Sequence, residues 1–213
     1  MYKELKKKYF ESNEIEILLQ NTNISVLDNF LENEENIKLF NKTFYRNNYP
    51  KTVLCGINPG KNGAGKTGVP FIDFISLSKM LKDVNRKDTE RSAQFFYEIV
   101  EEIGIERFYN SFYVTNISWV GYVKENKNLN YYDLPINVKA FIYDTFKYEM
   151  KIVSPTTIIS LSGKVKETIS KLFDNSNIDV TQQLAHPNYC AFPKNYDKYK
   201  SEYMDLLSRY LVK

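Results

Sequence analysis

The sequence predicts an α/β fold, a three-layer α/β/α sandwich around a central, mainly parallel sheet of four strands. Short apolar runs alternate along the chain with longer amphipathic patterns of helical period. The apolar runs are continuous rather than alternating with polar residues, which is typical of parallel strands that are covered on both faces. The chain has 213 residues, a length that suits one domain. We therefore expect a single domain over 1–213, with an N-terminal helical part at 1–50 and an α/β core at 51–213.

The first half of the pattern begins with helices. Apolar residues at helical spacing in 2–40 predict two or three helices before the first strand. Pro50 ends that pattern, and the run TVLCGI at 52–57 predicts a buried strand. A segment with four glycines and two prolines follows at 58–70, which places a flexible loop at the carboxyl end of this strand.

The remaining elements continue the alternation of helix and strand. Three more strands are expected, at 112–118, 156–161 and, less regular in sequence, 178–184. Helices are expected at 73–84, 92–103, 134–153, 163–174 and 196–211. Strands separated by helices are joined by right-handed crossovers, so the sheet should be parallel with its carboxyl ends at one edge.

Composition narrows the class of protein. The net charge of +3 permits binding to a phosphate backbone without arguing for it. The two cysteines, Cys55 and Cys190, are too few for a disulfide framework or for a four-cysteine zinc or iron–sulfur site. The chain lacks a long apolar run and an apolar leader, so we expect a soluble cytoplasmic protein that does not bind membranes.

The segment GKNGAGKT at 60–67 matches the phosphate-binding loop of NTPases, G-x-x-x-x-G-K-[ST]. In that motif a helix begins at the lysine and threonine and holds the phosphates at its N-terminus. Here Pro70 follows within three residues of Thr67, and proline cannot donate the amide that such a helix needs. The apolar run at 156–161 also ends without an aspartate for magnesium. Both features argue against an NTPase. The NTPase hypothesis is kept as an alternative, and it predicts ATP hydrolysis that depends on Lys66.

Three segments together resemble a known family. The string GINPGKNGAGKTGVPF at 56–71 resembles the first motif of the single-strand-selective monofunctional uracil-DNA glycosylases, in particular their bacterial second subtype. LAHP at 184–187 resembles the family's His-Pro motif, and YVTNI at 113–117 resembles the strand whose asparagine reads the base. The resemblance covers about residues 50–210 and implies the uracil-DNA glycosylase fold. It also implies a monomeric DNA glycosylase that needs no metal or cofactor, has no lyase activity, and acts on single- or double-stranded DNA.

The resemblance assigns roles around one extruded base. Asn58 would position the attacking water, and His186, the only histidine, would donate a hydrogen bond to O2 of the departing base. Asn116 would read the pairing edge and Phe71 would stack on the ring. Gly60 stands where thymine-excluding families carry a bulky aromatic, so space beside the base's 5-position is expected. Each residue alone has an ordinary structural explanation, and the argument depends on their joint placement at strand ends.

A second group of residues is expected to contact DNA outside the base pocket. Tyr189 or Phe192 would fill the gap left by the extruded nucleotide, and lysines would contact phosphates. The expected contacts are Lys66, Thr67, Lys164, Asn188, Tyr189, Phe192 and Lys194.

Two departures from the family pattern leave the substrate open. Lys66 precedes TGVPF, and Ser118-Trp119 replaces a Cys-Pro pair that is common in the family. The leading hypothesis is excision of uracil or a 5-substituted uracil such as 5-hydroxymethyluracil in DNA repair. Because both changes are expected near the pocket, they and the small Gly60 motivate an alternative, removal of a bulkier phage base such as glucosylated hydroxymethylcytosine in anti-phage defence. A further alternative is a module that binds modified DNA without turnover.

Overall fold

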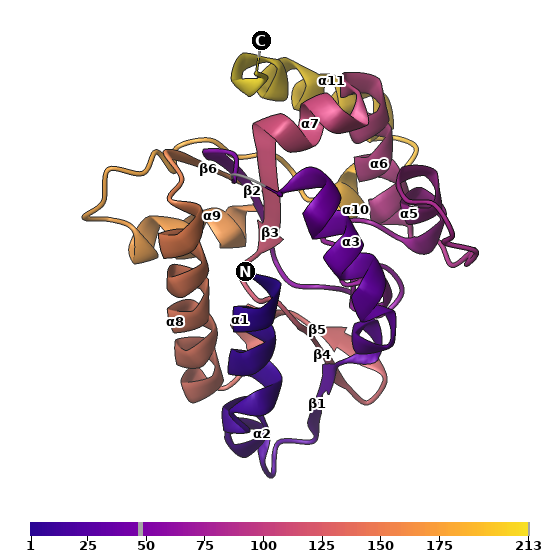
Figure 1. The fold of residues 1–213 in the computed structure, drawn as a ribbon. Coiled ribbons are helices and arrows are strands. Elements are labelled where there is room, and N and C mark those ends of the chain that lie inside the picture. The colour runs from indigo at the N-terminus through magenta and orange to yellow at the C-terminus, as the bar shows by residue number, and fades with distance from the viewer. Residues whose placement is uncertain (47–48, 213) are drawn as a thin grey trace.

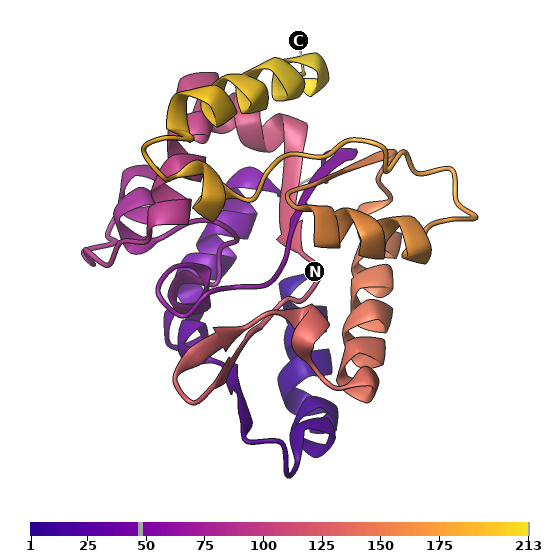
Figure 2. The same cartoon turned by 180° about the vertical axis from the view of Figure 1, so that it is seen from behind.

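A parallel three-stranded sheet with strand order β3-β2-β6 forms the centre of the computed structural model, which describes residues 1–46 and 49–212. Its strands are β2 (Thr52–Gly56), β3 (Phe112–Asn116) and β6 (Thr157–Ser160). Every residue of the three strands is buried, as the continuous apolar runs predict. Helices cover the sheet on both sides, which confirms the predicted α/β class (Figures 1 and 2).

The register of the sheet brings the strand ends together. Gly56 at the end of β2 pairs with Asn116 at the end of β3, and Cys55 pairs with Ser160 near the end of β6. The chain continues this alignment one residue further, because the Ile117 amide donates to the Gly56 carbonyl over 3.0 Å. The loops after β2, β3 and β6 therefore leave the sheet at the same edge.

The fourth strand, expected at 178–184, does not form. This segment runs beside β6 and makes only two isolated parallel bridges, Thr157 with Asp179 and Ser160 with Gln183. The bridges are three residues apart on β6 and four apart on the other segment, so an extra residue interrupts the ladder as in a β-bulge. The Asp179 carboxylate also accepts the Thr181 amide, which draws the backbone into a local turn. The segment still delivers residues 184–187 to the common edge.

The helices of the core lie close to where the sequence places them. On one side of the sheet, α9 packs against β6 and α8 lies beside it; on the other, α7 packs against β3 and contacts α3 and α6 (Figure 1). The predicted core helices are α5 (Phe74–Met80), α6 (Arg91–Ile103), α8 (Ile136–Val153), α9 (Gly163–Leu172) and α11 (Tyr196–Leu207), and η4 (Ser208–Tyr210) continues α11 within the range expected at 196–211. Elements that periodicity did not predict are α7 (Ile105–Ser111), α4 (Ala64–Thr67), α10 (Pro187–Cys190) and η3 (Tyr131–Asp133).

A second, antiparallel sheet of order β1-β4-β5 lies at the lower end of the molecule in Figure 1. It consists of β1 (Ile24–Leu27), β4 (Gly121–Lys124) and β5 (Lys127–Leu129). The expectation that 2–40 holds only helices is therefore wrong at β1. This short strand is stabilised by pairing with β4, about a hundred residues later in the sequence, and local periodicity cannot report such a contact.

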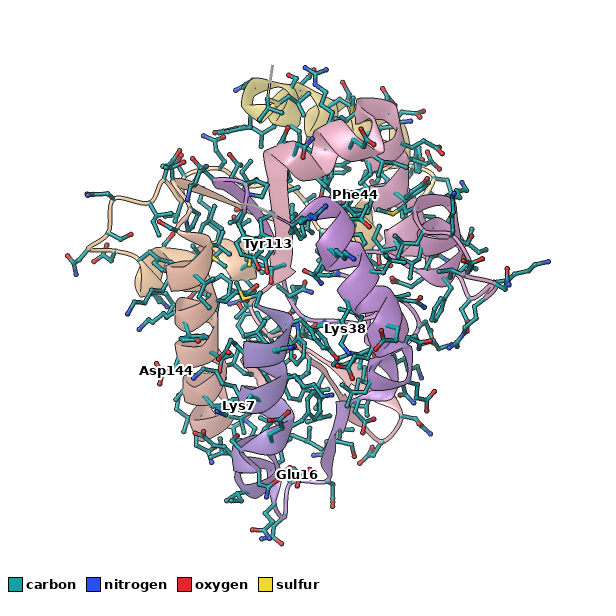
Figure 3. All side chains as sticks on the ribbon, in the orientation of Figure 1. Lys7, Glu16, Lys38, Phe44, Tyr113 and Asp144 are labelled. Carbon is teal, nitrogen blue, oxygen red and sulfur yellow. The ribbon has the colours of Figure 1, made fainter. Side chains whose placement is uncertain are left out.

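The N-terminal part is otherwise helical and packs on the core through aromatic rings. Its helices are α1 (Tyr2–Lys6), η1 (Lys7–Glu11), α2 (Glu14–Leu19), η2 (Asn29–Asn33) and α3 (Glu34–Phe44). Trp119 lies among four of their rings, those of Tyr2, Tyr9, Phe10 and Phe30. Charged side chains of these helices face outward, as Lys7, Glu16 and Lys38 do in Figure 3, and so does Asp144 of α8. No helix in the described part of the chain is both long enough and apolar enough to cross a membrane.

Candidate active site

A cavity of about 420 Å³ opens at the edge where the parallel strands end. All five residues expected to act on the base line it, although they come from four separate parts of the chain: Asn58, Gly60, Phe71, Asn116 and His186. The cavity volume falls in the range of small-molecule sites, about 300 to 1,000 Å³. The other residues that line it are Ile57, Pro59, Ala64, Glu90, Ser92, Asn128, Asn130 and Asn188.

The side chain of Asn58 is fixed at both ends of its amide, mainly by the end of β5 and the chain just after it. Its Oδ1 accepts the Tyr131 amide over 2.9 Å, and its Nδ2 donates to the Leu129 carbonyl over 3.1 Å and to the Pro59 carbonyl over 3.3 Å. Oδ1 keeps a second lone pair that can accept from a water. Asn58 can therefore orient a water molecule, but an amide cannot take its proton as a carboxylate would.

Asn116 and Phe71 meet above Gly56. A Cβ built on Gly56 would lie 2.7 Å from Phe71 Cε2, and closer still to Phe71 Cζ and Asn116 Oδ1. Phe71 also stacks on Phe96, with ring centroids 4.9 Å apart and an interplanar angle of 29°. Its backbone has φ of +58°, which is strained for a bulky residue and is characteristic of functional sites. Glycine at position 56 thus lets an aromatic ring and an amide share one wall of the cavity.

His186 presents a neutral imidazole of defined tautomer. Its Nδ1 accepts the Asn188 amide over 3.2 Å, so the proton of the neutral ring is on Nε2. Burial lowers the pKa of His186 from 6.5 to about 4, because the charged form loses hydration. The ring lies 6.1 Å from the Phe71 ring, centroid to centroid. At neutral pH the side chain can donate one hydrogen bond into the cavity and carries no charge.

Glu90 adds a carboxylate that the sequence analysis did not identify. It precedes α6, lines the cavity, and accepts a hydrogen bond from the Ser92 hydroxyl. Burial, with a smaller contribution from the nearby Asp73 carboxylate, raises the pKa of Glu90. Asn128 and Asn130 of the β5 segment were also missed. No motif marks these residues, because they reach the cavity through long-range packing.

The glycine-rich loop does not have the geometry of an NTPase phosphate loop. The helix α4 has four residues and ends at Gly68, whose φ is +71°. Lys66 forms an ion pair with Asp88, and the buried Thr67 hydroxyl donates to the Ile72 carbonyl over 2.6 Å. The expected DNA contact at Thr67 is therefore wrong, because its side chain is fully buried and fixes the loop.

The two departures from the family pattern do not line the cavity. Ser118 is buried and its hydroxyl donates to the Val120 carbonyl over 2.9 Å, while Trp119 belongs to the aromatic cluster of the N-terminal helices. Lys66 does not line the cavity either. These three positions were expected near the pocket, and none of them is among the residues that line the cavity.

The remaining candidates for DNA contacts lie on the outside. Asn188 lines the cavity mouth, and Tyr189 and Phe192 are 51% and 41% exposed. Arg91 lies over the Phe192 ring at 4.9 Å, which adds a cation that the sequence analysis did not identify. Lys164 and Lys194 are exposed, and Lys164 pairs with Glu167.

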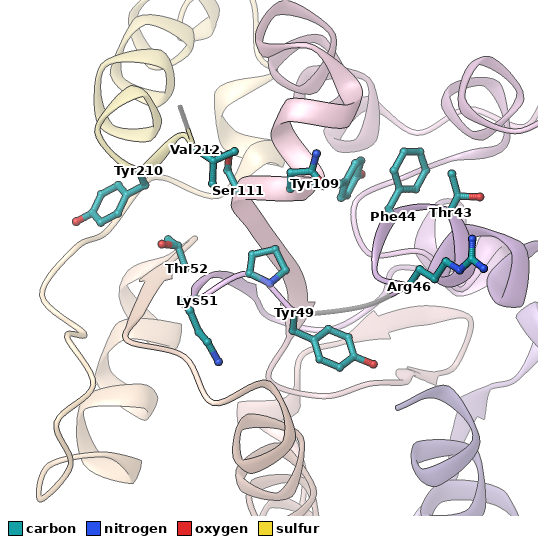
Figure 4. A pocket seen from close by; sticks show the side chains of 12 residues that line it. Thr43, Phe44, Arg46, Tyr49, Lys51, Thr52, Tyr109, Ser111, Tyr210 and Val212 are labelled. Atoms are coloured by element: carbon teal, nitrogen blue, oxygen red, sulfur yellow. Dashed lines mark hydrogen bonds between the residues drawn. The ribbon is translucent and has the colours of Figure 1, made fainter.

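A larger hollow of about 570 Å³ lies at the opposite end of the sheet, near the start of β2 and β3 (Figure 4). Arg46, Tyr49 and Lys51 line it, together with aromatic residues such as Tyr109. None of the residues expected to act on a base lies among those that the structure places around it. The chemistry expected from the sequence therefore belongs to the smaller cavity.

Within 1–46 and 49–212, no three His, Cys, Asp or Glu side chains gather in a metal-binding group.

Comparisons with known proteins agree with the fold. A sequence profile of the uracil DNA glycosylase superfamily matches residues 44–208. The crystal structure of wild-type SMUG2 from Pedobacter heparinus is similar, with a TM-score of 0.75 and 26% sequence identity, covering 87% of this chain and 88% of that chain. A comparison with curated proteins gave no significant match. The resemblance seen in residues 56–71 is confirmed, and the chain belongs to the uracil-DNA glycosylase superfamily.

Proposed function

We propose that this DNA glycosylase extrudes uracil or a 5-substituted pyrimidine from DNA and hydrolyses its bond to the sugar. The observation that carries the proposal is the convergence of Asn58, Asn116, Phe71 and His186 on one cavity. Two amides, one aromatic ring and one neutral imidazole form a set that can hold a pyrimidine by its edge and its face.

In the proposed reaction the C1′–N1 bond breaks and N1 keeps the electron pair. The resulting negative charge spreads to O2 and O4 of the base, and His186 Nε2–H donates to O2 while Asn116 binds the pairing edge. A water held by Asn58 adds its oxygen to C1′ and releases a proton to solvent. The products are the free base and an abasic site.

The state of His186 fits this reaction. A neutral imidazole can stabilise a developing oxyanion by a hydrogen bond without giving up a proton. Of the described residues that line the cavity, none is a lysine, so no Schiff base with the sugar is expected. Base excision without strand cleavage is the predicted outcome.

The proposed DNA contacts are exposed side chains that do not line the cavity. Tyr189 and Phe192 are exposed large side chains at and just after α10, where one of them can enter the gap in the base stack. Lys164, Lys194 and Arg91 supply cations for phosphates. We expect the protein to act as a monomer on cytoplasmic DNA in a repair role.

A bulkier modified pyrimidine is a second candidate substrate, which one observation favours. Gly60 lines the cavity, and in the described chain one atom outside the neighbouring residues, Asn128 Nδ2, lies within 4 Å of a Cβ built there, at the ordinary contact distance of 3.5 Å, so there is room on its other sides. A glucosylated hydroxymethylcytosine of phage DNA would need such space beside the 5-position, and its removal would serve defence.

A panel of oligonucleotides tests both candidates. Single strands and duplexes carrying uracil, 5-hydroxymethyluracil, glucosylated hydroxymethylcytosine, thymine or cytosine are incubated with the protein, and abasic sites are cleaved with alkali. Asn58→Ala and His186→Ala should each lower base release by about a hundredfold or more, whereas the control Asn137→Ala, on the exposed face of α8, should not.

The panel also has outcomes that contradict the proposal. Strand cleavage without alkali would contradict a monofunctional mechanism. If the wild-type protein binds modified DNA but releases no base, a non-catalytic binding module is favoured instead. If it releases uracil alone, the bulky base is excluded as a substrate.

A further inference from the structure

The proposed reaction depends on which way the Asn58 amide is turned. Only the oxygen end can accept a hydrogen bond from a water, and the torsion that turns an asparagine amide is broad and roughly two-fold. Two backbone groups outside its own loop select one orientation. The Tyr131 amide donates to Oδ1 over 2.9 Å, and Nδ2 donates to the Leu129 carbonyl over 3.1 Å. A flipped amide would set donor against donor and acceptor against acceptor, so the position of residues 129–131 sets the orientation of Asn58.

Two different contacts hold this short segment. Leu129 is the last residue of the β4–β5 ladder, where it pairs with Tyr122. Tyr131 lies beyond the ladder and begins the short helix η3. Its phenol is completely buried and lies against the rings of Tyr132 and Tyr143, with centroids 5.3 and 6.2 Å away. Residue 131 is thus held by its own side chain and not by the ladder.

The Tyr131 hydroxyl fastens this ring to α9. It lies 2.8 Å from Thr168 Oγ1 and donates to the Lys164 carbonyl over 3.2 Å. These two partners are four residues apart and therefore lie on the same face of the helix. The helix is itself anchored, because it packs against β6 and its first turn is capped by the Ser162 hydroxyl, which accepts the Val165 amide over 3.2 Å. Burial raises the pKa of Tyr131, so the hydroxyl keeps the proton that it donates.

We propose that Tyr131 is a positioning residue for hydrolysis of the bond between base and sugar. Its hydroxyl ties residue 131 to α9, and the amide of the same residue then holds Asn58 in the orientation that binds the attacking water. Tyr131 is not among the residues that line the cavity, so it acts through Asn58 and touches neither base nor water. This inference rests on the proposed function and adds to it a residue outside the cavity.

The variant Tyr131→Phe keeps the ring and removes the hydroxyl. Single-turnover release of uracil from an oligonucleotide gives the rate constant for bond breaking, and its dependence on protein concentration gives the half-saturating concentration. Displacing groups around a substrate by about 1 Å can cost about a hundredfold, and a loosened amide should cost about tenfold in the rate constant. The half-saturating concentration should change by less than about threefold, because the DNA contacts are kept. Tyr143→Phe, which removes a hydroxyl from the half-buried neighbouring ring on α8, is the matched control.

Two further measurements separate positioning from a general loss of stability. In the Asn58→Ala background, adding Tyr131→Phe should change the rate constant by less than about threefold, because the residue through which it acts is already gone. In isotope-labelled protein, the NMR signal of the Asn58 side-chain amide is identified by its absence from Asn58→Ala. Its hydrogens should exchange with water about tenfold faster in Tyr131→Phe than in the wild type. Thr168→Val, which removes one partner of the phenol, should shift both the rate constant and the exchange in the same direction by less, and it takes the place of Tyr131→Phe if that variant does not fold.

Three results would overturn the inference. If folded Tyr131→Phe has the wild-type rate constant and the wild-type exchange of the Asn58 amide, the hydroxyl does not position Asn58. If the substitution costs as much in the Asn58→Ala background as in the wild type, it acts on the fold and not through Asn58. If the loss lies in the half-saturating concentration, Tyr131 supports DNA binding instead. If the wild type releases no base at all, the proposed function fails, and the exchange measurement alone decides whether Tyr131 holds Asn58.

Discussion

Replacing Gly56 with alanine should damage the active site while leaving the fold largely intact. The new Cβ would lie 2.7 Å from Phe71 Cε2, whereas carbon atoms in contact prefer about 3.5 to 4.0 Å. The ring, or the strand, must therefore move by about 1 Å, and Asn116 Oδ1 is displaced as well. A 1 Å misplacement of groups around a substrate can lower the rate about a hundredfold. This corresponds to about 2.7 kcal/mol of transition-state stabilisation.

The assay is single-turnover release of uracil from an oligonucleotide, with thermal unfolding measured on the same samples. Overpacking of this kind costs about 1–3 kcal/mol of stability, so the variant should remain folded at 25 °C. The control is Gly163→Ala, where the nearest atom to the new Cβ is 3.9 Å away. If folded Gly56→Ala releases uracil within about threefold of the wild-type rate, then Phe71 and Asn116 do not hold the base as proposed.

Three further predictions concern ionisable and amide groups. Because the folded-state pKa of His186 is about 4, kcat/KM should be flat from pH 6 to 8; a rise with a midpoint near 6.5 would show that the ring titrates like an exposed histidine. Asn58→Asp should lower excision and the melting temperature, since a carboxylate oxygen would replace the Nδ2 donor opposite the Leu129 and Pro59 carbonyls; a faster enzyme would contradict this. Glu149 is buried, and desolvation raises its pKa from 4.5 to about 7. The native state therefore holds this proton more tightly than the unfolded state does. As the pH rises from about 4.5 to 7, the free energy of unfolding should fall by roughly 3 kcal/mol. Chemical denaturation of Glu149→Gln should lose this slope, and an unchanged slope would assign it to other groups.

The sheet could be predicted because its signal is local. The runs at 52–57, 112–118 and 156–161 are mainly apolar on both strand faces, and turn or helix residues bound each of them. Their composition therefore predicts buried strands. The convergence of Asn58, Asn116 and His186 then follows from parallel topology, because strand ends share one edge. The segment at 178–184 has more polar residues than these runs, and it makes only two isolated bridges to β6.

The missed features depend on contacts between distant segments. β1 forms only because β4 pairs with it, and the clamp on Asn58 comes from Leu129 and Tyr131, about seventy residues later in the chain. Glu90 reaches the cavity because Asp73 holds its backbone. No sequence motif marks these positions. An acidic residue just before a helix, such as Glu90, is common, so it gives no sign of a functional role.

Trp119, the only tryptophan, gives the protein an internal optical reporter. Its indole lies 5.3–6.1 Å, centroid to centroid, from the rings of Tyr2, Tyr9, Phe10 and Phe30, yet it stands only three residues after Asn116. Emission from this one fluorophore will shift to longer wavelength when the N-terminal helices detach and water reaches the ring. A fluorescence titration can therefore distinguish variants that loosen this contact from variants that change only the cavity, before any activity is measured.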